Sequence, residues 1–196
     1  MNQTLHTPFS RPIMVQKLPS HKEFKKVIVP EIIKKYETRT NDKAGWSKYC
    51  NTWMTKAMGL DLIESELKSC INSWFSFFSY PFINYTLDAW YNVHTWNMHQ
   101  NIHTHMSASN VLSGIYYIQL HPYDYTVTFL DMNNRYMEMA RGIDLAPKNP
   151  MLSEEFEPDL GEGDLILFRP DTYHLVLPAD KKHDQYRISL AFNVVA

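Results

Sequence analysis

The spacing of apolar residues changes at Pro81, and this change divides the chain into two kinds of structure. Between Trp46 and about Phe78 the apolar residues recur at helical spacing. After Pro81 they alternate with polar residues, as residues on the two faces of a strand do. The sequence therefore predicts an α+β fold in which helices come first and a β-rich half follows.

Helical signals dominate the first half. A helix is predicted from Ser20, whose hydroxyl can cap free amides, with Glu23 at the capping-box position. Pro30 is expected to break or restart this helix. A second helical region is divided by Gly59, and its later part carries an apolar stripe that we interpret as core. The stripe comprises Leu60, Leu62, Ile63, Leu67, Ile71, Trp74 and Phe75.

Strand signals dominate the second half, and a short first strand is also possible at Ile13–Gln16. The alternating pattern begins at Asn84 and continues to Asn92. Further strands are predicted at Val111–Leu120, Tyr125–Leu130, Asp164–Phe168, His174–Leu177 and Arg187–Val195. The proline-rich segment Arg141–Gly161 is predicted to be a long loop, which in a compact domain is usually functional.

Composition narrows the class of protein. The 196 residues fit one domain, or one domain with a helical extension, and 44% apolar residues suffice for a buried core. A net charge of −2 gives no electrostatic reason to expect nucleic acid as a partner. No apolar run reaches the roughly 18 residues of a membrane span. Two cysteines, Cys50 and Cys70, form no disulfide framework, so we expect a cytoplasmic protein.

Histidines supply the clearest chemical signal. His103 and His105 would face the same side of a strand and could hold one ion together, with His174 as a distant third ligand. Imidazole suits iron, zinc, copper and nickel alike, so the pattern predicts a metal site without naming the metal. His99 shares the strand parity of the pair and could replace one of them. Three other histidines, His94, His121 and His183, are interpreted as ordinary polar or surface residues.

The last predicted strand carries a largely polar face. Arg187, Ser189, Ala191 and Asn193 share one side, and apolar residues share the other. A buried guanidinium needs a carboxylate partner, because an unpaired buried cation is very costly. That partner could be the remote end of a keto acid such as 2-oxoglutarate, or a protein acid such as Asp164 or Asp184.

Four ordered fragments carry a resemblance that covers Trp90 to Asn193. They are His103-Thr-His105, Leu112-Ser-Gly-Ile-Tyr-Tyr117, Gly163-Asp-Leu-Ile-Leu-Phe-Arg-Pro170 with His174 and Pro178, and Arg187-Ile-Ser-Leu-Ala-Phe-Asn193. The set resembles the 2-oxoglutarate/Fe(II) oxygenase family of bacteria and phages. The resemblance implies helices packed on a double-stranded β-helix, a jelly-roll barrel with Fe(II) at its open end. It divides the chain into a mainly helical part, 1–82, and an oxygenase core, 83–196, that together form one compact unit.

The resemblance also implies roles for individual residues. His103 would be the first iron ligand and His174 the distal one, while Arg187 and Ser189 would bind the far carboxylate of 2-oxoglutarate. The wider superfamily places an acid where this chain has His105. A three-histidine site can still bind Fe(II), although it changes the charge at the metal. Asp124 or Asp131 could instead supply a carboxylate from a neighbouring strand.

Other pocket residues and functions complete the expectations. Asn92, Tyr117 and Tyr116 are candidates to line the keto-acid pocket, although the two tyrosines fit core packing equally well. Gly114 is expected at a close backbone approach or a bulge. The implied reaction is hydroxylation of a C–H bond of a small molecule or protein, coupled to decarboxylation of 2-oxoglutarate to succinate. The alternatives are a cupin-type three-histidine metalloenzyme that uses no keto acid and a non-catalytic jelly-roll binding protein. The sequence leaves the oligomeric state open.

Overall fold

The computed structural model describes residues 11–39, 52–81, 84–132 and 154–196. Two α-helices, α1 (His21–Glu37) and α2 (Glu64–Phe77), pack on antiparallel strands, and the 3₁₀ turn η1 (Leu60–Leu62) precedes α2. The α+β prediction is therefore confirmed. None of the helices in the described ranges is long and apolar enough to cross a membrane.

Ten strands form two antiparallel sheets. They are β1 (Ile13–Lys17), β2 (Trp53–Lys56), β3 (Thr86–His94), β4 (Gln100–His103), β5 (Asn110–Gln119), β6 (Val127–Leu130), β7 (Glu155–Phe156), β8 (Asp164–Phe168), β9 (Tyr173–Val176) and β10 (Arg187–Val195). The larger sheet has the order β1-β8-β5-β10-β3-β2, and the smaller has the order β4-β9-β6-β7. Strand pairing within the described residues leaves two separate sheets and does not close a barrel.

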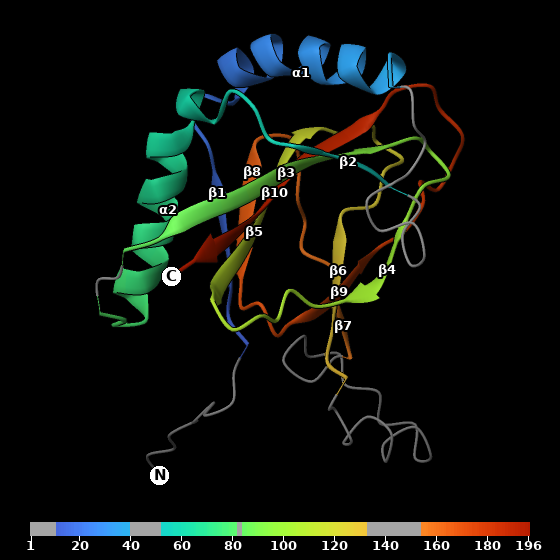
Figure 1. The fold of residues 1–196 in the computed structure, drawn as a ribbon. Coiled ribbons are helices and arrows are strands. Elements are labelled where there is room, and N and C mark those ends of the chain that lie inside the picture. The colour runs from blue at the N-terminus through green and yellow to red at the C-terminus, as the bar shows by residue number, and fades with distance from the viewer. Residues whose placement is uncertain (1–10, 40–51, 82–83, 133–153) are drawn as a thin grey trace, which may run out of the picture.

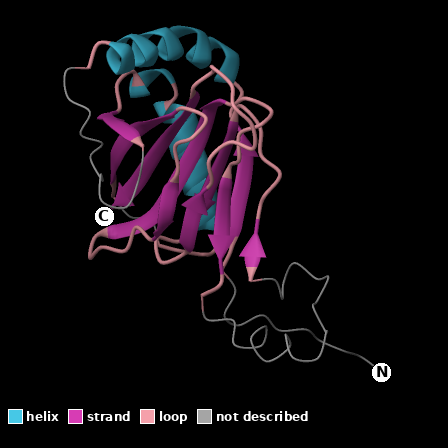
Figure 2. Ribbon diagram, turned by 90° about the vertical axis from the view of Figure 1, so that its right-hand side faces the viewer, coloured by secondary structure: helices cyan, strands magenta, loops and turns pink. Residues whose placement is uncertain are grey.

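The helices and the two sheets form layers because each element buries its apolar face against the next. Both helices lie on the side of the six-stranded sheet that is remote from β4, β6, β7 and β9 (Figure 1; Figure 2 shows the same layers from the side). The main core lies between these helices and the sheet. On β10, Ile188, Leu190 and Phe192 are fully buried in this core, so the opposite face, which begins at Arg187, points toward the smaller sheet. The predicted two-faced pattern of the last strand is confirmed.

A second, smaller core fills the space between the two sheets. It contains Tyr117, Phe129 and Phe168 together with three aliphatic side chains, Ile115, Val127 and Ile166. This core lies next to the site described below, since Ile115 belongs both to the core and to the wall of the cavity there.

The helices differ from the sequence prediction in two details. Pro30 does not end α1, because it lies on the exposed face and five buried residues, from Phe24 to Tyr36, fix the helix against the sheet. Ser20 precedes α1 but does not cap it, since its hydroxyl donates to the Glu66 carboxylate of α2 instead. The apolar stripe is confirmed as core except at Leu62, which is 49% exposed in the 3₁₀ turn.

Strands were predicted best in the second half. All five strands predicted after Pro81 and beyond Asn92 are present within a few residues, and the alternating segment before them becomes β3. The expected helix across Trp53–Lys56 is wrong: this segment is β2, whose backbone pairs with β3 at the sheet edge. The sequence does not predict the short strands β4 and β7, and β7 lies in the segment Arg141–Gly161, which is predicted to be a loop. Residues 141–153 of that segment lie outside the described part of the chain, and so does Cys50.

Candidate metal centre

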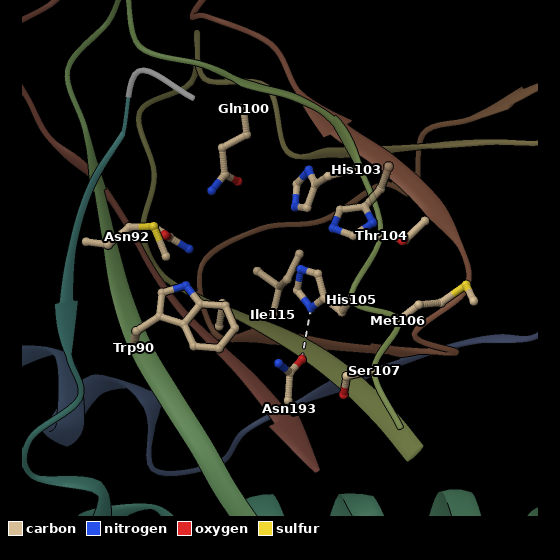
Figure 3. Close-up of a pocket in the computed structure, with 13 residues that line it drawn as sticks. Trp90, Asn92, Gln100, His103, Thr104, His105, Met106, Ser107, Ile115 and Asn193 are labelled. Carbon is tan, nitrogen blue, oxygen red and sulfur yellow. Dashed lines mark hydrogen bonds between the residues drawn. The ribbon is translucent and has the colours of Figure 1, made fainter. Parts of the chain in front are cut away.

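Three histidines from separate segments meet between the sheets. His103 ends β4, His174 lies on β9 directly opposite it in the strand register, and His105 follows in the loop after β4. One nitrogen of each ring lies within 4.8 Å of the corresponding nitrogens of the other two. All three histidines line the same cavity, and Figure 3 shows the rings of His103 and His105 in its wall. The predicted convergence of His103, His105 and His174 is thus present in the structure.

His105 reaches the cluster by a different route from the one that strand alternation suggests. Strand β4 ends at His103, so the two histidines do not share the face of one strand. The backbone N–H of His105 donates instead to the carbonyl of Pro170, 2.9 Å away, which fixes the loop after β4. The backbone of His105 is therefore positioned by contact with a loop that is distant in sequence, and not by a local pattern.

Each ring is oriented by a hydrogen bond at Nδ1. His103 Nδ1 lies 2.7 Å from the carbonyl of Asn101, and His174 Nδ1 lies 2.9 Å from that of Thr172. Because a carbonyl can only accept, both Nδ1 atoms carry the proton, and the ring lone pair of each histidine lies on Nε2. Hydrogen bonds of this kind are typical of metal-binding histidines.

The third ring has a side-chain partner. His105 Nδ1 lies 2.9 Å from Oδ1 of Asn193 on β10. Ser113 Oγ donates to the same Oδ1 at 3.0 Å and in turn accepts from Asn110. This chain of hydrogen bonds fixes the Asn193 amide with its oxygen toward the ring, so His105 also carries its proton on Nδ1.

Burial keeps all three rings neutral at pH 7. Desolvation lowers the pKa of His103, lowers that of His105 to about 4, and lowers that of His174 well below its usual value. Repulsion between protonated rings lowers the pKa of His105 and His174 further. Neutral imidazole is the form that binds a metal ion. Three neutral nitrogen donors within 4.8 Å therefore fit a divalent transition metal.

The alternative ligands lie elsewhere. Asp124 is paired with His183 at 3.1 Å, and neither Asp124 nor Asp131 lines the cavity. His99 is likewise absent from the cluster. Among the described residues, no carboxylate joins the three histidines within ligand distance.

The cavity beside the histidines has a volume of about 210 Å³. Its described lining contains amides, hydroxyls, thioethers and the Trp90 indole, but no Asp, Glu, Lys or Arg. Asn92 is 4% exposed and projects from β3 into the cavity, and its Oδ1 atom has no hydrogen-bond partner in the described part of the chain. The predicted pocket role of Asn92 therefore has a structural basis.

Arg187 lies deeper, at the far end of the same β10 face. It is 2% exposed, and its Nη1 donates to the carbonyls of Tyr125 and Leu177 at 2.6 and 3.0 Å. Its Nη2 donates to the carbonyl of Met98 at 3.4 Å, while none of the described residues accepts a hydrogen bond from Nε. Burial lowers the pKa of this guanidinium. The carbonyls orient the group but do not neutralise its charge.

No protein carboxylate pairs with Arg187 among the described residues. Asp164, one suggested partner, pairs with Lys17 at 3.3 Å, and no ion pair joins Arg187 to Asp184. The nearby Asp124 partly offsets the effect of burial on the guanidinium pKa. Arg187 is thus a buried cation without a salt bridge, which is an unusual and costly arrangement in a protein interior.

The two other predicted residues lie between Arg187 and the cavity. Ser189 is opposite Asn92 on one side and Tyr117 on the other. Tyr117 is buried between the sheets and its hydroxyl accepts from the backbone N–H of Val127 at 2.8 Å, so it does not line the cavity. Tyr116 faces the helices instead.

Two residues that line the cavity are not predicted as site residues from the sequence. Trp90 and Gln100 line the cavity, and neither stands in a recognised motif. Strand parity could have found Trp90, since it shares a strand face with Asn92.

Comparison with known proteins agrees with this geometry. A family model described as "Putative 2OG-Fe(II) oxygenase" matches residues 88–193, which include the three histidines and Arg187. No curated protein matches the sequence.

Several solved structures are similar in fold. A prolyl-4-hydroxylase from Pseudomonas putida is 13% identical, with a TM-score of 0.63 over 95% of this chain and 93% of that one. A viral collagen prolyl hydroxylase from Paramecium Bursaria Chlorella virus-1, determined with 2-oxoglutarate, is 15% identical, with a TM-score of 0.58 over 93% and 96%. HygX from Streptomyces hygroscopicus, determined with nickel, 2-oxoglutarate and hygromycin B, is 11% identical, with a TM-score of 0.51 over 93% and 82%. At such low identity these similarities concern the fold.

Proposed function

We propose that this chain, which belongs to the 2OG-Fe(II) oxygenase family, hydroxylates a C–H bond of its substrate and converts 2-oxoglutarate to succinate. The observation that carries the proposal is the convergence of three neutral histidine nitrogens on one cavity wall. Family membership implies Fe(II) and 2-oxoglutarate as cofactor and cosubstrate. Iron with a bound keto acid supplies oxygen activation, while the protein supplies binding, orientation and exclusion of water.

We assign the metal to Nε2 of His103, His105 and His174. The Nδ1 hydrogen bonds direct these lone pairs away from Asn101, Asn193 and the Thr172 carbonyl. Three protein ligands leave further positions for a keto acid and oxygen. Because all three ligands are neutral, the site retains the full 2+ charge, which favours an anionic ligand such as a keto acid.

We assign the remote carboxylate of 2-oxoglutarate to Arg187 and Ser189. The support is the buried guanidinium, whose Nε has no hydrogen-bond partner among the described residues. A ligand carboxylate would supply the missing negative charge and accept from Nε. We also propose that Asn92 contacts the middle of the keto acid and that Tyr117 lies at the base of this binding region, since both residues are opposite Ser189 in the strand pairing.

The fold proposed for this chain is the double-stranded β-helix of the family. Its support is the arrangement of two facing antiparallel sheets with the histidines between them. We further propose that 1–82 and 83–196 form one unit, since β1 pairs with β8 and β2 pairs with β3. The N-terminal part thus extends both edges of the larger sheet.

A cupin-type metalloenzyme without a keto acid is the second candidate. The absence of a carboxylate among the described residues of the cluster favours it. In that enzyme Arg187 would be structural, held by three carbonyls. The two candidates differ in whether 2-oxoglutarate is consumed.

Succinate formation from 2-oxoglutarate, measured in air with Fe(II)-loaded protein and no added substrate, tests the proposal. We expect slow, iron-dependent turnover in the wild type and none in His174→Ala. His99→Ala is the matched control, since this histidine is not in the cluster, and it should retain turnover. Iron binding without any loss of 2-oxoglutarate would favour the cupin-type enzyme. Equal turnover in His174→Ala and the wild type would contradict the assignment of the metal site.

A further inference from the structure

The Trp90 indole is the most unusual group of the cavity wall. Its Nε1 atom is buried and makes no hydrogen bond within the described residues. An indole N–H can only donate, and a buried donor without an acceptor is rare in proteins. In Figure 3 the nitrogen edge of the ring points into the cavity and toward Asn92.

Trp90 lies on the metal side of the proposed keto-acid region. Along β3, His94 is opposite Arg187, Asn92 is opposite Ser189, and Trp90 is opposite Ala191. The Trp90 ring lies 5.9 Å from the His105 ring, centroid to centroid. A keto acid that runs from the metal to Arg187 would pass Asn92 and leave the indole N–H free.

Among the fully buried polar atoms of its described lining, the cavity therefore holds one unmatched donor and one unmatched acceptor. The donor is Trp90 Nε1 and the acceptor is Asn92 Oδ1, two residues further along the same strand face. No charged side chain lines the cavity among the described residues, and its aliphatic and thioether contacts come from Met54, Met106, Ile115 and Ala191. Once the keto acid occupies the metal, a charged substrate group bound here would lose water without gaining a side chain of opposite charge. A neutral amide, which has one acceptor edge and one donor edge, fits both unmatched groups.

We propose that Trp90 determines substrate specificity by donating its indole N–H to the carbonyl oxygen of a neutral amide in the substrate. Asn92 Oδ1 accepts from the N–H edge of the same amide, and its amide nitrogen remains for the keto acid. The substrate is then an amide-containing molecule whose reactive C–H bond is held beside His105. This proposal rests on the proposed function, because it identifies the substrate of the same site.

The test uses a neutral probe and its charged counterpart. N-acetyl-L-alanine methylamide and N-acetyl-L-alanine are titrated into ¹⁵N-labelled protein loaded with Zn(II) and 2-oxoglutarate, which does not turn over. Zinc binds the same imidazole ligands. The Trp90 indole resonance is assigned by its loss in Trp90→Phe. We expect a saturable downfield shift of this resonance with the diamide and none with the carboxylate.

Trp90→Phe retains an aromatic ring and removes the N–H, so it should weaken diamide binding about tenfold, or about 1.4 kcal/mol. Trp96→Phe is the matched control, since Trp96 does not line the cavity, and it should bind the diamide like the wild type. Unchanged melting temperature and zinc affinity in Trp90→Phe would show that the loss is local. A blocked pentapeptide that binds tighter than the diamide would identify a polypeptide substrate, and equal affinity would identify a small amide.

Three results would overturn the proposal. They are the absence of saturable diamide binding, equal binding of the carboxylate, and an unmoved Trp90 resonance while other cavity resonances shift. Binding of 2-oxoglutarate to the metal-loaded protein is measured separately. If that binding holds while the diamide fails, only the assignment of the substrate is wrong.

Discussion

Gly114 lies where β5 has no room for a side chain, and Gly114→Ala makes the packing of this sheet testable. A Cβ atom at this position would lie 2.3 Å from Cζ of Phe192 and 2.7 and 2.8 Å from its two Cε atoms. Phe192 is directly opposite on β10 and is fully buried. Its ring therefore cannot move without displacing the core below the helices. The sequence predicts a close backbone approach or a bulge at Gly114, whereas the group that lies against it is the Phe192 side chain, and the strand register is regular at this position.

The expected cost follows from these distances. Overpacking a core usually costs about 1–3 kcal/mol, and replacing glycine in a strand recovers about 0.5–1 kcal/mol of backbone entropy. Because contacts of 2.3–2.8 Å are far too short for carbon atoms, the upper part of the overpacking range applies. The net loss in the free energy of unfolding should be about 1–2.5 kcal/mol, which lowers the melting temperature of a domain of this size by roughly 2–10 °C. Urea denaturation followed by tryptophan fluorescence measures the loss directly.

Two further variants complete this experiment. Gly161→Ala is the matched control, because a Cβ there would meet only an Asp164 oxygen at 3.7 Å, and its stability should stay within about 0.5 kcal/mol of the wild type. Phe192→Leu should relieve the clash, so Gly114→Ala should cost less than about 0.5 kcal/mol in that background. If Gly114→Ala and Gly161→Ala were equally stable, the steric reasoning would be refuted.

Three other predictions concern the metal centre. Asn193→Ala removes the acceptor for His105 Nδ1, so Zn(II) affinity in a chelator competition should fall about 10–100-fold, and an unchanged affinity would show that this hydrogen bond is dispensable. Zn(II) at about 100 times its Kd should stabilise the wild type by about 2.7 kcal/mol in thermal unfolding. It should leave the stability of His174→Ala unchanged. Equal stabilisation of the two proteins would exclude His174 as a ligand. Without metal, the free energy of unfolding should fall as the pH drops from 6.5 to about 4. In this range His105 is protonated in the unfolded chain but stays neutral in the folded protein, where burial lowers its pKa to about 4. This ring should contribute at most about 3 kcal/mol to the loss. Urea titrations at pH 7 and 5 check the last prediction, and greater stability at pH 5 would contradict it.

The features that the sequence predicts best are those encoded by local alternation. The two faces of β10 follow from a period of two, so the burial of Leu190 and the inward direction of Arg187 could be predicted without a structure. The histidine pattern predicts a metal site for a similar reason, because its donors are recognisable by type. Side-chain chemistry and strand parity are both local properties of the chain.

The features that were missed depend on contacts between distant segments. Segment Trp53–Lys56 forms a strand only because the edge of β3 is available to pair with it. The orientation of His105 depends on the carbonyl of Pro170, and the three carbonyls around Arg187 come from three loops. No local pattern specifies such partners. The unmatched indole of Trp90 is recognisable only once the cavity around it is known.

The central claim is that this cavity holds iron with 2-oxoglutarate anchored at Arg187. Anaerobic titration of the Fe(II)-loaded protein with 2-oxoglutarate tests it most directly, by the weak visible charge-transfer band of a chelated keto acid. We predict that the band forms in the wild type, needs a higher 2-oxoglutarate concentration in Arg187→Ala, and is absent in His174→Ala. Iron binding without any band would contradict the keto-acid site, and the absence of iron binding would contradict the metal centre itself.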